Sequence, residues 1–164
     1  MIGCLRVLWS KKNNCNCFCV VYALVRLFSY TINMDTIFTK IIRGEIPCYK
    51  VYEDDYGFAF LDIHPYALGH VLLVSKLPVD HFFELNDPDY TKLFQAAKKL
   101  APAIQKATNS KRVGLVVEGL EVPHVHLKLI PINKAGDLDS PNAHEESTEQ
   151  MLMIQQKIID NLNN

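Results

Sequence analysis

His124, His126 and Lys128 stand two residues apart in the segment 123–131, which otherwise alternates polar and apolar residues. Such alternation is typical of a β-strand with one buried face. Side chains two residues apart point to the same side of a strand, so we expect these three basic groups in one row. Two imidazoles beside an ammonium group favour a site for an anion or a metal ion.

A neutral imidazole is the group in this row best suited to covalent chemistry. Its ordinary pKa lies near ~6.5, so at pH 7 it attacks phosphorus as the free base. We therefore predict that His126 attacks a phosphate ester or phosphoramidate while its neighbours neutralise the phosphoryl oxygens and protonate the leaving group. Two alternatives stay open: a zinc site, completed by His70, His81 or an acidic residue, and a strand whose polar residues have no chemical role.

The composition indicates one globular domain and argues against a general nucleic-acid-binding protein. The chain has 164 residues, of which 49% are hydrophobic and 21% charged, and this length suffices to bury a core. The net charge of the whole chain is −1. Residues 1–33 contain four basic residues and no acidic one, so the rest of the chain has a net charge of −5. Surfaces that follow nucleic-acid phosphates need an excess of Lys and Arg, whereas a site for one small phosphate ligand does not.

Residues 1–33 differ from the rest of the chain. They hold four of the five cysteines and an apolar run, 18–30, which contains Arg26 and is shorter than the roughly 20 residues of a membrane-spanning helix. We expect Met34 to be the true start and residues 1–33 to be a mis-assigned extension. A targeting or membrane-associated segment and a metal or redox role are the alternatives. Without the extension only Cys48 remains, which fits a reducing, cytoplasmic compartment and no contact with a membrane.

Residues 34–164 are expected to form a single α+β domain with antiparallel strands. Neighbouring strands linked by short turns, with helices before, between and after them, favour this class. The expected elements are a short helix capped by Asp35 and ended by Gly44, strands 49–53, 58–63, 70–75, 113–117 and 123–131, a helix over 87–107 bent at Pro102, a polar loop over 133–146, and a last helix opened by a Ser147–Gln150 capping box.

Several segments together resemble the histidine-triad (HIT) family. They are TIFTKIIRGEIP (36–47) with VYEDD (51–55), AFLDIHP (59–65), GHVLLV (69–74) and VPHVHLKLIP (122–131), in that order. The resemblance covers residues 35–132 and implies a five-stranded antiparallel sheet packed against helices, usually in a homodimer. It also implies a Hint-like nucleotide hydrolase or transferase without a cofactor, acting at the α-phosphate of purine nucleotides such as adenosine phosphoramidates or dinucleoside polyphosphates.

Carried over by position, the resemblance assigns roles to individual residues. His126 is the nucleophile that forms a covalent nucleotidyl-histidine, His124 orients it, and His70 is a further histidine near this pair. Asp62 accepts hydrogen bonds from the ribose hydroxyls. Aromatic and branched side chains suit the face of a purine, and the apolar residues expected to enclose the base are Phe38, Ile41, Phe60, Ile63 and Leu72.

The third position of the triad holds Lys128 in place of histidine. An ammonium group binds anions, but its ordinary pKa of about 10.4 makes it a poor proton shuttle at neutral pH. Glu121 adds a negative charge where small polar residues of the family often meet the leaving group. Thr36 and Thr39 stand where some members have a zinc-binding Cys-x-x-Cys, so no zinc is expected. Two functions therefore compete: an active hydrolase, and a catalytically weakened purine-nucleotide-binding module that acts as a sensor or interaction partner.

Overall fold

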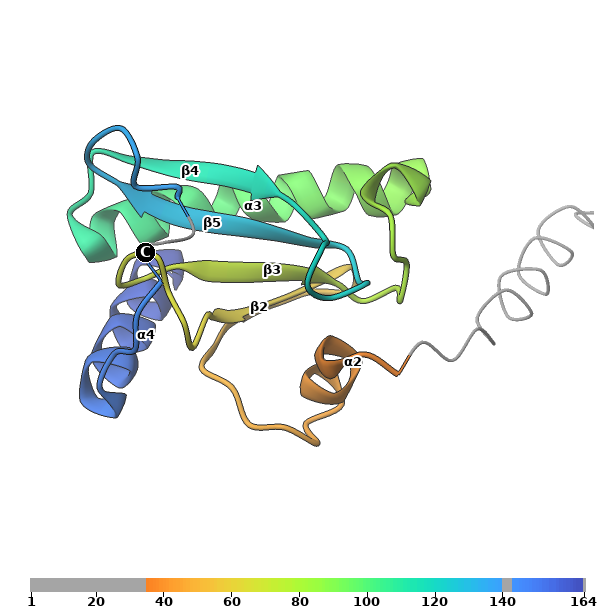
Figure 1. Cartoon of the computed structure of the whole chain (residues 1–164), viewed down its shortest axis with the longest axis horizontal. Coiled ribbons are helices and arrows are strands. Elements are labelled where there is room, and N and C mark those ends of the chain that lie inside the picture. Colours follow the sequence, from red (N-terminus) through yellow and green to blue (C-terminus); the bar gives the residue numbers. More distant parts are fainter. Residues whose placement is uncertain (1–34, 140–142, 164) are drawn as a thin grey trace, which may run out of the picture. The chain divides into compact units, whose positions relative to one another are not determined.

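The computed structural model describes residues 35–139 and 143–163, so the expectations for residues 1–33 and for the start at Met34 lie outside the described residues. Within the described part, five strands form an antiparallel sheet in the order β1-β2-β3-β5-β4 (Figure 1). The predicted α+β class and five-stranded antiparallel sheet are confirmed. The elements are α2 (Ile37–Ile42), β1 (Lys50–Glu53), β2 (Gly57–Leu61), β3 (Val71–Ser75), the 3₁₀ helix η1 (Phe82–Glu84), α3 (Asp87–Thr108), β4 (Arg112–Val117), β5 (His126–Ile132) and α4 (Thr148–Asn163).

One face of the sheet forms the main core. Leu73 of β3 and Leu127 of β5 pack there with Leu100 of α3 and Ile158 of α4, and all four side chains are fully buried. Burying one such side chain contributes about 1.5–3 kcal/mol. The two longer helices therefore fix the sheet from one side and leave its other face for α2 and the polar residues of β5.

The opposite face of the sheet carries the short helix α2. Phe60 and Leu72 pack there against Phe38 of α2 in a second, smaller apolar cluster. The antiparallel register places Leu72 beside Lys128 and the neighbouring Val74 beside His126. Strand pairing thus sets this apolar cluster next to the two basic side chains of β5.

The ends of two helices differ from the sequence-based expectation. The N-cap of α2 is Thr36 rather than Asp35, because the Thr36 side chain accepts a hydrogen bond from the backbone N–H of Thr39 at 3.2 Å. Asp35 lies one residue earlier and pairs with Arg43 at 3.2 Å. Helix α3 continues through Pro102 to Thr108, one residue beyond the predicted end.

The last helix begins as predicted. The backbone N–H of Gln150 donates to Ser147 Oγ at 3.2 Å, and the backbone N–H of Ser147 donates to Gln150 Oε1 at 3.2 Å. This reciprocal pair is a capping box, and it confirms the expected start of α4.

Four of the expected strands are shorter than predicted, and three of these changes concern a candidate site residue. Strand β5 begins at His126 because the chain turns before it, with the backbone N–H of His124 donating to the Val122 carbonyl at 2.8 Å. Strand β2 ends at Leu61, which leaves Asp62 in the following loop. Strand β3 begins at Val71, directly after His70. Several candidate residues therefore lie just beyond the ends of strands, next to a residue of the main core.

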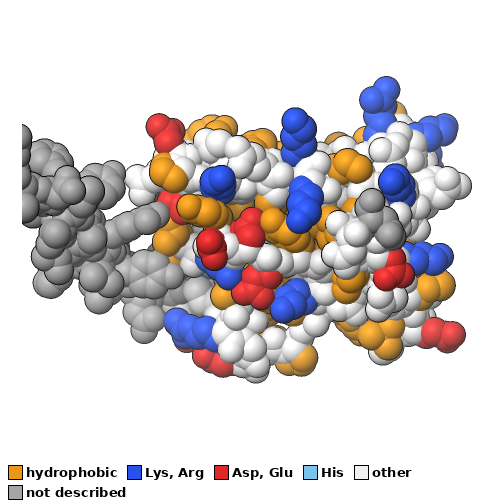
Figure 2. Space-filling view, turned by 180° about the vertical axis from the view of Figure 1, so that it is seen from behind, with side chains coloured by type: hydrophobic (Ala, Val, Ile, Leu, Met, Phe, Trp, Pro, Cys, Tyr) orange, Lys and Arg blue, Asp and Glu red, His pale blue; other side chains and the backbone are white. Residues whose placement is uncertain are grey.

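The surface of the described part is mixed in character. Figure 2 shows acidic and basic side chains interspersed on one face, with hydrophobic side chains between them. None of the helices in residues 35–139 and 143–163 is both long and apolar enough to cross a membrane.

Candidate active site

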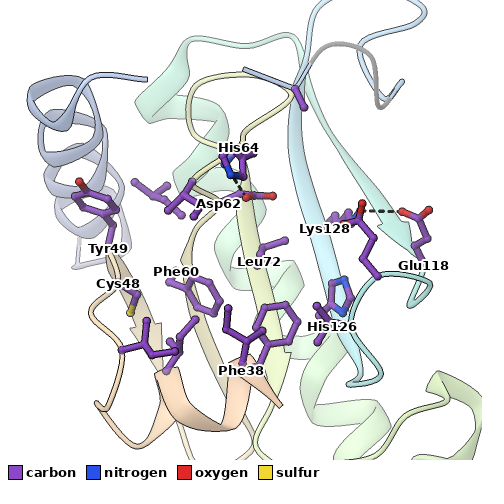
Figure 3. Close-up of a pocket in the computed structure, with 18 of the residues that line it drawn as sticks. Phe38, Cys48, Tyr49, Phe60, Asp62, His64, Leu72, Glu118, His126 and Lys128 are labelled. Carbon is purple, nitrogen blue, oxygen red and sulfur yellow. Dashed lines mark hydrogen bonds and ion pairs between the residues drawn. The ribbon is translucent and has the colours of Figure 1, made fainter. Parts of the chain in front are cut away.

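A cavity of about 390 Å³ is bounded by α2, the sheet and the segment 118–122 between β4 and β5 (Figure 3). This volume suits a small-molecule ligand, for which pockets measure roughly 300–1,000 Å³. All the residues predicted to bind the nucleotide line it, and so do two of the four predicted catalytic residues. These lining residues are Phe38, Ile41, Phe60, Asp62, Ile63, Leu72, His126 and Lys128.

His126 is held in one tautomer by the backbone. Its Nδ1 lies 2.7 Å from the carbonyl oxygen of His124, and because a carbonyl only accepts, Nδ1 carries the hydrogen. In the neutral ring the lone pair is therefore on Nε2. The side chain is 6% exposed, and its ring meets that of Phe38 edge-on with centroids 5.1 Å apart.

The pKa of His126 lies below its ordinary value. Burial is the largest cause, the Lys128 ammonium adds to it, and the hydrogen bond to the His124 carbonyl opposes it. The ring is consequently neutral at pH 7, the form in which Nε2 acts as a nucleophile.

His124 lies behind the cavity rather than in its wall. Its buried ring donates from Nε2 to the Ser75 carbonyl at 2.7 Å, which leaves Nδ1 to accept from the Thr36 hydroxyl at 2.9 Å. His124 precedes the regular strand, but its ring lies on the same side of the sheet as that of His126, as predicted, because both rings meet Phe38 edge-on, with centroids 5.8 and 5.1 Å away. His124 contacts His126 through its backbone carbonyl.

Lys128 is an ion-paired ammonium in the wall of the cavity. Its Nζ donates to Glu118 Oε2 at 2.8 Å and to Tyr66 Oη at 3.4 Å, and its side chain is 8% exposed. Burial lowers the pKa of Lys128, but the ion pair with Glu118 and the hydrogen bond to Tyr66 outweigh burial, so the pKa lies above its ordinary value. The same hydrogen bond lowers the pKa of Glu118. Both groups are charged at neutral pH, and they largely compensate each other.

Asp62 is oriented by the loop that follows β2. Its Oδ1 accepts a hydrogen bond from the backbone N–H of His64 at 2.9 Å, and its Oδ2 lies 3.4 Å from Nδ1 of His70. The His70 ring is fully buried behind the cavity, where burial lowers its pKa to about 4 against the opposing effect of Asp62. The Lys128 and His126 charges lower this pKa further, so His70 lies within electrostatic reach of both.

Sequence reasoning did not identify Tyr66 and Glu118 as partners of Lys128. Tyr66 lies in a loop without a regular pattern, and Glu118 directly follows the expected strand 113–117. The one usable signal was Lys128 itself, because a lysine on a buried strand face needs an acidic partner. The end of the neighbouring strand, where Glu118 stands, was the place to look for it.

No group of three or more His, Cys, Asp or Glu side chains within residues 35–139 and 143–163 is arranged to hold a metal ion. Within these residues, neither His70 nor His81 joins His124 and His126 in such a group. The described residues therefore do not supply the third ligand that the zinc hypothesis requires.

Comparisons with known proteins agree with this geometry. The HIT domain matches residues 43–135, more than half of the chain. An uncharacterized HIT-like protein of Methanocaldococcus jannaschii is 40% identical over 103 residues, which cover 58% of this chain and 77% of that protein. An adenosine 5'-monophosphoramidase of Saccharomyces cerevisiae is 39% identical over 102 residues, which cover 62% of this chain and 65% of that enzyme.

Solved structures agree as well. The crystal structure of a HIT-like protein of Bartonella henselae matches with a TM-score of 0.68 and 28% identity, over 77% of this chain and 96% of that one. A domain match over more than half of the chain, together with relatives at this level of identity, is decisive. The chain belongs to the HIT domain family.

Proposed function

We propose that this protein is a Hint-like nucleotide hydrolase that attacks the α-phosphate of a purine nucleotide derivative with His126. The observation that supports this most strongly is the neutral ring of His126, fixed at Nδ1 by the His124 carbonyl at 2.7 Å in the wall of a ligand-sized cavity. The similarity to an adenosine 5'-monophosphoramidase supports the choice of a phosphoramidate as substrate.

The reaction proceeds in two steps. First, the lone pair of His126 Nε2 forms a bond to the α-phosphorus while the P–N bond of the phosphoramidate breaks, and the departing nitrogen takes a proton from solvent to leave as an amine. A water molecule then attacks the phosphorus, loses a proton to solvent and displaces the imidazole. The products are a nucleoside monophosphate and an amine, and His126 returns to its neutral form.

The remaining side chains of the cavity bind the substrate. Phe38 and Phe60, whose ring centroids lie 5.9 Å apart, are placed with Leu72 to contact the purine. The Asp62 carboxylate accepts hydrogen bonds from the ribose hydroxyls. Lys128 keeps its proton and binds a phosphoryl oxygen, so in this chain the third triad position contributes charge rather than proton transfer.

Hydrolysis of adenosine 5'-phosphoramidate by the wild type and by His126→Ala tests this proposal. We expect the substitution to lower kcat by a factor on the order of 10³ or more, because it removes the nucleophile. A matched control is His81→Ala, since the His81 side chain is 72% exposed and does not line the cavity. Unchanged turnover in His126→Ala would refute the proposed mechanism.

Binding of AMP separates the hydrolase from the alternative, a purine-nucleotide-binding module. If the wild type binds AMP in a manner that depends on Asp62 but hydrolyses no phosphoramidate, the sensor or partner role replaces the hydrolase.

A further inference from the structure

The charged side chains around the cavity are unevenly balanced. Among the described residues that line it, Lys128 is the only Lys or Arg, whereas three are acidic: Asp62, Glu118 and Glu121. Lys128 is already paired with Glu118 at 2.8 Å. A phosphate group that reaches His126 therefore meets one partly neutralised cation and an excess of carboxylates.

Two of these carboxylates belong to one wall. Glu118 and Glu121 lie in the segment 118–122, which follows β4 and lines the cavity together with Gly119, Leu120 and Val122. In Figure 3, Glu118 lies next to Lys128 and His126, across the cavity from Cys48 and Tyr49. The Glu118 side chain is 39% exposed and Glu121 is exposed, so both of these lining residues are accessible to solvent.

This wall is the one left for the group attached to the α-phosphate. The proposed purine site uses Phe38 and Phe60, and the proposed ribose site uses Asp62. Neither of these sites uses Glu118 or Glu121, although Val122 of the same segment packs against the cluster of Phe38 and Phe60. The substituent that leaves the phosphorus is then the part of the substrate that faces Glu118 and Glu121.

We propose that Glu118 and Glu121 select the leaving group by charge, so that the preferred substrates are nucleoside phosphoramidates of amines that carry a further positive charge. This inference rests on the proposed function and specifies its substrate class. An amine that keeps a second, protonated amino group after the P–N bond has formed, such as an alkyl diamine, is attracted to the two carboxylates. An anionic leaving group, including the polyphosphate of a dinucleoside polyphosphate, is repelled by them and finds no second Lys or Arg among the described lining residues.

Three adenosine 5'-phosphoramidates that differ only at the far end of the amine test this selection. Their amines are ethylenediamine, β-alaninamide and β-alanine, which end in a cation, a neutral amide and an anion. For the wild type we expect kcat/KM to fall in that order, with about a tenfold difference between cation and anion for half-exposed charges. Diadenosine tetraphosphate is expected to be hydrolysed more slowly than the ethylenediamine compound.

The ratio of kcat/KM for the cationic amine to kcat/KM for the anionic amine, measured in variants, tests whether Glu118 and Glu121 cause the selection. Glu121→Gln and Glu118→Gln each keep the side-chain shape, and each is expected to reduce the cation-to-anion ratio, while the double variant brings it close to one. Glu84→Gln is the matched control, since Glu84 is exposed and does not line the cavity. Equal rates for the three amines in the wild type, or an unchanged ratio in the double variant, would overturn the inference.

Binding to His126→Ala separates this inference from the hydrolase proposal. Calorimetric titration of the same three compounds with this variant is expected to give dissociation constants in the order cation, neutral, anion. If the wild type hydrolyses none of them, the proposed function fails and the order of the dissociation constants still decides the inference. If hydrolysis proceeds with equal affinities and equal rates, only the inference fails.

Discussion

His126 owes its reactive form to a neighbour's backbone rather than to a neighbour's side chain. The His124 carbonyl fixes the tautomer at 2.7 Å, while the His124 ring is occupied by Ser75 and Thr36. The sequence identified both histidines and placed their rings on one side of the strand, where both contact Phe38. Only the tertiary contacts show that the His126 ring lines the cavity while the His124 ring is buried behind it.

The pH dependence of turnover follows from the pKa of His126. Because burial holds this pKa below its ordinary value, we expect the acidic limb of the kcat/KM profile to lie below pH 6.5. The Glu118 carboxylate raises the same pKa, so Glu118→Gln is expected to move the limb to still lower pH. A limb above pH 6.5, or a shift toward higher pH in the variant, would contradict this assignment of the titrating group.

Lys128 shows the limit of prediction at single residues. The sequence predicts a cation that binds anions, and in the structure Lys128 lines the cavity. Its partners Glu118 and Tyr66 come from segments without a regular pattern, so the alternation that located Lys128 carried no information about them. Whether its charge is free or already compensated depends on these tertiary contacts.

Helix α2 is the element that links the proposed purine site to the histidines. The hydroxyl of Thr36 caps the helix by accepting from the backbone N–H of Thr39, and it donates to His124 Nδ1. The sequence predicted this helix but assigned its N-cap to Asp35. Asp and Thr are both favourable N-cap residues, so the residue type alone does not distinguish Asp35 from Thr36. The contact with His124, 88 positions later in the chain, decides in favour of Thr36.

Substitution of Thr36 tests this link. Thr36→Val removes the cap and leaves the buried Nδ1 of His124 without a donor, which together are expected to cost about 2 kcal/mol of unfolding free energy. Thr36→Ser keeps the hydroxyl and is expected to stay within about 0.5 kcal/mol of the wild type. Urea denaturation measures both values. Equal stability of the Val and Ser variants would show that the hydroxyl does not support this region.

The loop before β3 depends on a close approach to α3. Gly69 has φ +92°, and a Cβ added there would lie 2.5 Å from Cγ2 of Thr108. The Thr108 hydroxyl is bonded to the Ile104 carbonyl at 2.8 Å, which limits its movement. The residue after Gly69 is His70, which lies against Asp62, so a displaced loop also reaches the proposed ribose site.

Gly69→Ala and Gly44→Ala form a matched pair. The difference between their losses of unfolding free energy measures the cost of the close contact between residue 69 and Thr108. Gly44 has φ +77° but open space around it, so its substitution costs only the backbone strain of about 1 kcal/mol. Gly69→Ala carries a similar strain and the clash with Thr108, and it is expected to cost at least about 1 kcal/mol more. Thermal or urea unfolding compares them, and equal losses would contradict the crowding at Gly69.

At the scale of the whole molecule, the class and sheet of the fold were predictable, whereas the exact ends of its elements were not. Alternating residues and short turns located all five strands, and Ser147 with Gln150 located the start of α4. The expected ends failed where long-range bonds override local pattern, as at Thr36, or where the chain turns within an apparent strand, as at His124. The cavity is bounded by such strand ends. The sequence therefore indicated which residues line the cavity, but not the hydrogen bonds and ion pairs that these residues make.

The three buried histidines make the stability of the molecule sensitive to mild acid. The pKa of His70 is lowered to about 4, and those of His124 and His126 are also lowered, chiefly by burial. Below pH 6.5 the unfolded chain therefore binds protons that the folded chain does not. The stabilisation is complete above about pH 6.5, the ordinary pKa of histidine, and declines as the pH falls toward 4.

Urea unfolding between pH 7 and pH 4.5 measures this decline. We expect the unfolding free energy to fall with pH in the wild type and to fall less steeply in His70→Asn, whatever the stability of the variant at pH 7. The slope is the quantity compared, because it reports proton uptake rather than packing. An equal slope in both proteins would show that His70 does not contribute.

In the proposed mechanism His126 becomes covalently bound to the nucleotide, and intact-mass spectrometry detects such an adduct. The wild type is mixed with adenosine 5'-phosphoramidate, stopped within the first turnovers at alkaline pH, where phosphohistidine survives, and digested to locate the modification. We predict a mass increase of one adenylyl group on the peptide that contains His126, and none in His126→Ala. Turnover without any adduct, or an adduct on another residue, would show that His126 is not the nucleophile.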